Sequence, residues 1–159
     1  MEAFLLEKAI VKTVAGPVDL DTAAVTGTCV DMKNLKRLTF LVVLAAGTTT
    51  TTHTFTLKQH DAATAGNSAD LEVMNPYYHK VGAATSYTKV EPTAAAAAYA
   101  LHATLGNSVA VVAFEVLPEQ LTSGYRWVSL DIADTGGAQL GTVIALGDTE
   151  FNPGYAEVV

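Results

Sequence analysis

The chain has 159 residues, a length that fits one domain with a sizeable core and needs no disulfide framework. Only 16% of its residues are charged while half are hydrophobic, so its surface is either partly covered by a partner or made polar by uncharged side chains. The formal net charge of −7, with no basic cluster beyond residues 33–37, disfavours nucleic acid as a partner.

The cysteine content and the first residues indicate in which cellular compartment the protein is assembled. Cys29 is the single cysteine and cannot form an internal disulfide, which fits assembly in a reducing compartment. We expect it to pack as a small hydrophobic residue, and a catalytic thiol is the less favoured alternative. The first eight residues carry acidic groups in place of a basic signal region, and no segment approaches the roughly 20 apolar residues of a membrane helix. We therefore expect no membrane partner and no standard export signal.

The first strands are predicted from alternation and from one long apolar run. Residues 7–14 alternate loosely and predict a strand closed by a turn at Gly16-Pro17, with a polar loop over residues 18–26. Residues 35–46 give the strongest strand prediction, because their nearly uninterrupted apolar run is typical of a strand buried on both faces. A short buried helix is the alternative, which the β-branched residues disfavour.

A threonine-rich connector joins this run to the alternating segment 53–60. This arrangement predicts a β-hairpin, with Phe55 and Leu57 facing the core. Residues 61–70 form a stretch of small residues that we expect to be an exposed, mobile loop and a place for contacts with a neighbour.

The middle of the chain is less regular. Tyr77 and Tyr78 follow a proline beside a predicted loop, where tyrosines serve either interfaces or core edges. The alanine-rich residues 94–98 are compatible with a short helix, but the alternation that follows and the clear strand over residues 109–117 favour a hairpin.

The last third of the chain returns to strands. Residues 118–124 predict a turn or a single helical turn, since proline can begin it and glycine can end it. Strands are predicted over residues 125–133 and 140–146, and residues 152–159 are expected to be a flexible tail. The whole chain, residues 1–159, is therefore predicted to be one all-β domain of about eight antiparallel strands with little helix, either a β-sandwich or a jelly roll.

No catalytic motif or metal-binding spacing is present. The four histidines are scattered and are expected on exposed strands or loops: His53, His60, His79 and His102. The acidic pairs Asp19/Asp21 and Asp131/Asp134 lack the further ligand and the glycine of a calcium loop. The sequence predicts no catalytic residue, no cofactor and no metal site, and hence a protein that is not an enzyme.

Four segments, in their order along the chain, carry a family resemblance. VDMKNL (30–35) precedes the apolar strand, FTLKQHD (55–61) follows the connector, and FEVLPEQL (114–121) precedes YRWVSLDI (125–132). In this order the chain resembles the small virion proteins of tailed bacteriophages, which are similar in role to capsid decoration or cement proteins. The resemblance covers most of the chain and carries no site residues with a defined chemical role.

The resemblance implies a structural protein that is assembled in the host cytoplasm and located on the capsid surface of the virion. Its partners would be the major capsid protein, whose capsomer junctions it would stabilise, and further copies of itself. A homotrimer is expected, since threefold lattice junctions favour one. A tail, fibre or head-tail joining component is the alternative within the virion.

Interface residues are predicted in two places. Residues 1–14 are a possible N-terminal arm, in which residues 1–11 would anchor on the shell by pairing with an exposed strand edge. Phe4, Leu5 and Leu6 are its candidate interface residues.

The second place is aromatic: Tyr77, Tyr78 and Trp127 are candidate contact residues. In a function of another class, a carbohydrate-binding β-sandwich, the same three side chains would stack on sugar rings.

Overall fold

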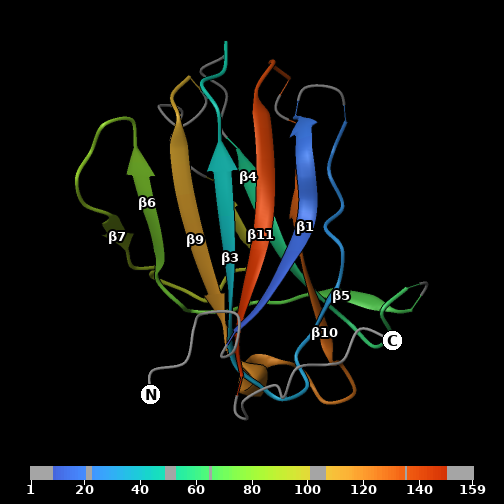
Figure 1. Ribbon diagram of the computed structural model, residues 1–159. Helices are drawn as coiled ribbons and strands as arrows, with labels where there is room; N and C mark the ends of the chain where they lie inside the picture. The colour runs from blue at the N-terminus through green and yellow to red at the C-terminus, as the bar shows by residue number, and fades with distance from the viewer. Residues whose placement is uncertain are drawn as a thin grey trace, which may run out of the picture.

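The structure is a computed structural model that describes residues 9–20, 23–48, 53–64, 66–100, 107–134 and 136–149. These residues form two antiparallel sheets, which Figure 1 shows one behind the other. The two sheets share one hydrophobic core. The described part of the chain contains eleven strands, against about eight predicted, and one 3-10 turn. The predicted all-β, sandwich-like class is confirmed. No helix among the described residues has the length and apolar character needed to cross a bilayer.

The larger sheet has six strands, and Figure 1 looks onto its outer face. In spatial order its strands are β1 (Ala9–Asp19), β11 (Leu140–Thr149), β3 (Leu35–Leu44), β9 (Ala110–Val116), β6 (Tyr77–Val81) and β7 (Thr88–Val90). The predicted strand over residues 35–46 is thus confirmed as β3. Its inward side chains Leu38, Phe40 and Val42 are fully buried, whereas every second residue between them is only half-buried. The described chain therefore covers β3 on one face and not on both.

The smaller sheet lies behind the larger one in Figure 1. In spatial order its strands are β2 (Val30–Asp31), β10 (Trp127–Ile132), β4 (Thr54–His60) and β5 (Ser68–Asp70), and β8 (Ala98–Ala100) also pairs with β4. Phe55 and Leu57 on β4 enter the core as predicted, since both are at most 1% exposed.

The predicted hairpin between residues 35–46 and 53–60 is wrong. β3 pairs with β11 and β9 in the larger sheet, whereas β4 pairs with β10 in the smaller one. The chain passes from one sheet to the other between them. Alternation identifies which side chains face the core, but two strands that follow each other can face the same core from opposite sheets.

The predicted turn at Gly16-Pro17 is also wrong, because β1 continues through it to Asp19. Two irregularities in its register against β11 accommodate these residues, one between Thr13 and Ala15 and one between Ala15 and Val18. Among the described strands, β1 pairs with β11 alone and is an edge strand. A proline, which has no N–H group to donate, is tolerated at such an edge and beside a bulge.

The segments around the alanine-rich stretch need a further correction. The short helix is absent, and Ala98–Ala100 form β8, but β8 pairs with β4 and makes no hairpin with β9. The single helical turn is confirmed as the 3-10 turn Pro118–Gln120. Residues 101–106, the predicted tail at 152–159 and the first eight residues of the predicted arm lie outside the described residues, while residues 9–14 are part of β1.

Candidate functional site

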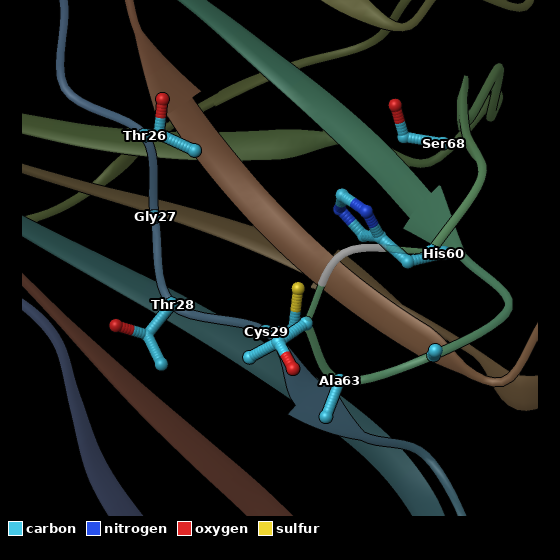
Figure 2. Close-up of a pocket in the computed structure, with 10 residues that line it drawn as sticks. Thr26, Gly27, Thr28, Cys29, His60, Ala63 and Ser68 are labelled. Atoms are coloured by element: carbon cyan, nitrogen blue, oxygen red, sulfur yellow. The ribbon is translucent and has the colours of Figure 1, made fainter.

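A pocket of about 470 Å³ lies at the end of β4, between residues 26–29 and the loop 61–66. Figure 2 shows the side chains that line it. The walls are made of small side chains and backbone, and the polar groups are hydroxyls, one thiol and one imidazole. These groups belong to Thr26, Thr28, Cys29, His60, Thr64 and Ser68.

A chain of hydrogen bonds holds the imidazole of His60. Its Nε2 lies 2.9 Å from Ser129 Oγ, and the Ser129 hydroxyl donates to Asp131 Oδ1 at 3.3 Å. The same carboxylate oxygen accepts from the backbone N–H of Gly27 at 3.0 Å. All these side chains lie on the faces of β4 and β10 that point away from the core.

This order of groups differs from that of a hydrolase triad. In a triad the imidazole lies between the carboxylate and an accessible hydroxyl, so that it can take the proton of the nucleophile. Here the hydroxyl of Ser129 lies between Asp131 and His60 and is fully buried. The arrangement therefore orients the His60 ring and presents no serine nucleophile to the pocket.

The thiol of Cys29 is not activated either. Burial raises its pKa, the carboxylate of Asp131 raises it further, and Lys12 opposes part of this effect. Lys12 donates through Nζ to the backbone oxygen of Cys29 at 2.7 Å, which fixes the segment. Because the thiolate is the reactive form, a raised pKa makes this thiol a poor nucleophile.

The loop beyond β4 is closed by a pair of side chains. Asp61 accepts from the backbone N–H and the side-chain amide of Asn67, both at 2.8 Å. A Cβ on Gly66 would lie 2.2 Å from Asp61 Oδ1, so the turn leaves no room for a side chain there. The predicted exposure of this loop is confirmed for most of residues 61–67, but Ser68–Asp70 form β5.

The histidines do not gather into a metal site. His53 is fully buried, contrary to the prediction, and burial lowers its pKa while a contact with Gln139 opposes part of that lowering. His60 lines the pocket and His79 is half-buried on β6, whereas His102 lies outside the described residues. Within the part of the chain that the structure describes, no three histidine, cysteine or acidic side chains come together as metal ligands.

The predicted aromatic contact residues lie on different surfaces. Tyr77 points inward, with its ring centroid 5.6 Å from that of Tyr99 and 5.7 Å from that of Phe114, and burial raises its pKa. Tyr78 alternates with Tyr77 and so lies on the outer face of the larger sheet. Trp127 is half-buried on β10 in the smaller sheet, where the Arg126 guanidinium lies 5.4 Å from its ring centroid. Phe4, Leu5 and Leu6 lie outside the described residues.

A surface that the sequence analysis did not identify lies on the outer face of the larger sheet. Six half-buried apolar side chains on three neighbouring strands form this outer apolar face: Leu41, Val43, Val111, Ala113, Ile144 and Leu146. Cross-strand pairing places Leu41 between Ala113 and Ile144, and Val43 beside Val111. The sequence carried a signal for it, since β9 and β11 are apolar on both faces in the same way as β3.

The edge of the same sheet is a second exposed surface. Ile10 and Val11 on β1 are 42% and 46% exposed. At residues 9–13 the strand has β11 on one side and no backbone partner on the other among the described residues. The open edge ends at Val14, whose backbone oxygen accepts from the N–H of Thr28 at 3.0 Å.

No protein-family model matches the chain, and a search of curated proteins finds no match. Among solved structures, the chain is similar to the crystal structure of the SPBc2 prophage-derived protein YomS. The two share 12% sequence identity with a TM-score of 0.44, over 87% of this chain and 92% of that one. A likeness at this level identifies neither a family nor an activity.

Proposed function

We propose that this chain is a non-enzymatic structural protein of a tailed-phage virion, and specifically a decoration protein that binds the outer capsid shell. The family resemblance in the sequence supports this assignment, as does the two-sheet fold with an open sheet edge. The major capsid protein would be its partner, and the capsid surface its location.

The observation that carries the proposal is the open edge of β1. Unpaired backbone groups at a sheet edge can accept a further strand from another protein, which adds main-chain hydrogen bonds without any special side chain. The exposed side chains of Ile10 and Val11 would add apolar contact. Residues 1–8 lead directly into this edge, and their Phe4, Leu5 and Leu6 extend the apolar character.

Attachment of this kind would stabilise a capsid by mass action. A protein that bridges two capsomers adds interface only while they stay together, so it favours the assembled shell. Many copies on a symmetric lattice multiply a modest contribution from each. The homotrimer expected from the sequence would fit threefold junctions, and it is the alternative to the face-to-face pair inferred below.

The proposal is tested by co-sedimentation with shells of the source phage that lack this protein. We expect the full chain to bind and a variant without residues 1–8 to lose at least about tenfold in affinity, which corresponds to about 1.4 kcal/mol. Met74→Ser changes another exposed apolar residue, 60% exposed and distant from β1 in sequence, and serves as the control. Undiminished binding of the truncated chain would show that residues 1–8 do not anchor the protein on the shell.

Copy number separates decoration from the alternative positions in the virion. Quantitative mass spectrometry of purified particles measures the number of copies of this chain relative to the major capsid protein. For a decoration protein we expect a ratio near one to one or a simple lattice fraction of it. A few copies per particle would instead indicate a tail, fibre or joining component, and complete absence would overturn the virion assignment.

The carbohydrate-binding alternative receives no support from the geometry. Tyr77 and Tyr78 point to opposite faces of the larger sheet, and Trp127 lies on the smaller one. The three side chains therefore do not form one stacking surface.

A further inference from the structure

The outer apolar face is unusual for an uncovered surface. β3, β9 and β11 carry apolar side chains on both faces, a composition typical of strands that are covered on both sides. The described chain supplies the smaller sheet as a cover for the inner face only. At the end of β3 the outer face continues into a shallow apolar groove of about 360 Å³, which is lined by Val43, Val109 and Leu140 among others. Contiguous exposed apolar patches of this kind mark interaction sites.

The size of the sheet fits a protein partner. With strands about 4.8 Å apart and about 3.3 Å per residue, the strand residues of the larger sheet span on the order of 700 Å². A stable protein interface buries about 800 Å² on each partner, so a second sheet of the same size would cover this one almost completely. Two apolar sheet faces also pack well on each other, about 10 Å apart, as in any β-sandwich.

The charges at the ends of the face are arranged for self-pairing. Lys80 lies on the outer face at one end, beside Val111, and forms no ion pair with another described residue. Glu115 and Asp148 lie at the other end, where Arg37 is 3.8 Å from each carboxylate and leaves one net negative charge. A copy turned end for end would bring its Lys80 to this acidic end.

We infer that the outer apolar face binds a second copy of this chain. The two copies are related by a twofold axis that runs across the strands through the row of Ala113, Leu41 and Ile144. This axis stacks the central apolar rows and places Lys80 of each copy near Glu115 of the other, so both charge contacts form at once. The pairing uses the face of the sheet, whereas shell binding uses the backbone groups at the edge of β1, so different variants test the two.

The first test is the mass of the purified chain by size-exclusion chromatography with light scattering. We expect a dimer, and we expect Ala113→Lys to give a monomer with an unchanged circular dichroism spectrum. The control is Ala98→Lys, the same change at an exposed position of β8 in the smaller sheet, which should stay dimeric. A monomeric or trimeric unmodified chain, or a dimeric Ala113→Lys variant, would overturn the inference.

A charge-reversal series keeps the inference testable if Ala113→Lys fails to fold. Lys80→Glu and Glu115→Lys should each weaken the dimer at least about fivefold, or about 1 kcal/mol, because each sets like charges against one another. The double variant should regain affinity relative to either single change. The Glu115→Lys single variant and the double variant both place a lysine beside Arg37 of the same copy. A difference in affinity between these two variants therefore reports only the contact between copies. A double variant as weak as the two single changes combined would overturn the twofold arrangement.

Discussion

Gly27 packs closely against β10, and its backbone N–H donates to Asp131 on that strand at 3.0 Å. A Cβ at this position would lie 2.3 Å from the backbone oxygen of Leu130 and 2.9 Å from Val14 Cγ1. Because one of these atoms belongs to a paired strand, we expect Gly27→Ala to lower the free energy of unfolding by about 1–3 kcal/mol. Gly16→Ala is the matched control, since no atom lies within 4 Å of its added Cβ. Urea unfolding of both variants checks this, and equal stabilities would contradict it.

His53 should make stability depend on pH near neutrality. Burial lowers its pKa in the folded protein, so the unfolded chain takes up a proton at a higher pH than the folded protein does. Its contribution is present in full above the ordinary histidine pKa of about 6.5, and it is lost as the pH falls from that value through the lower pKa of the folded protein. We expect the unfolding free energy to fall as the pH drops from about 6.5 towards the lower pKa of the folded protein, and His53→Gln to flatten the change.

Asp31 affects the unfolding free energy in a different pH range, so the two contributions can be told apart. Hydrogen bonds from Arg126 lower its pKa, so its contribution is lost only as the pH falls below the ordinary aspartate pKa of about 3.9. Urea titrations at several pH values separate the two ranges. An identical slope near neutrality in the parent and in His53→Gln would show that another group is responsible.

At the scale of elements, the positions and inward faces of the main strands could be predicted, but their partners could not. β3 lies within the predicted strand 35–46, and its neighbours β9 and β11 come from residues beyond 109. Hydrophobic alternation is a local property of the chain, whereas pairing depends on which of several similar apolar strands pack together over the core. The continuation of β1 through Pro17 was missed for a related reason, since proline is acceptable only once the strand is known to be an edge.

A pair of side-chain amides holds the 3-10 turn against the larger sheet. Gln120 Oε1 accepts from the backbone N–H of Leu117 at 2.8 Å and from Asn75 Nδ2 at 2.9 Å, and its Nε2 donates to Asn75 Oδ1 at 2.8 Å. We expect Gln120→Ala to cost about 1–3 kcal/mol of unfolding free energy, because it leaves partly buried polar groups without partners. Glu119→Ala, an exposed change in the same turn, should cost much less. Denaturant unfolding compares the two, and equal losses would contradict the role of the amide pair.

At the scale of the molecule, the sequence contained a signal for the outer apolar face but none for the pocket at the end of β4. Apolar residues on both faces of β3, β9 and β11 already indicated a sheet with two covered sides, although the sequence could not say which side lacked a cover. The pocket takes Gly27 and His60 from distant segments, and a third segment supplies Asp131, which accepts a hydrogen bond from the Gly27 N–H; their spacing in the sequence is not distinctive. Its assembly follows from the sheet pairing, which local patterns do not specify.

Pairing through the outer apolar face should make the heat stability of the molecule depend on its concentration. Folded copies that associate are stabilised by mass action, so Tm should rise with protein concentration. Ala113→Lys should remove this dependence, whereas Ala98→Lys and the deletion of residues 1–8 should retain it. Scanning calorimetry over a wide concentration range measures all four proteins. Since the truncated chain lacks the segment proposed to bind the shell, its behaviour separates self-association from shell binding, and a concentration-independent Tm in the unmodified chain would exclude the pair.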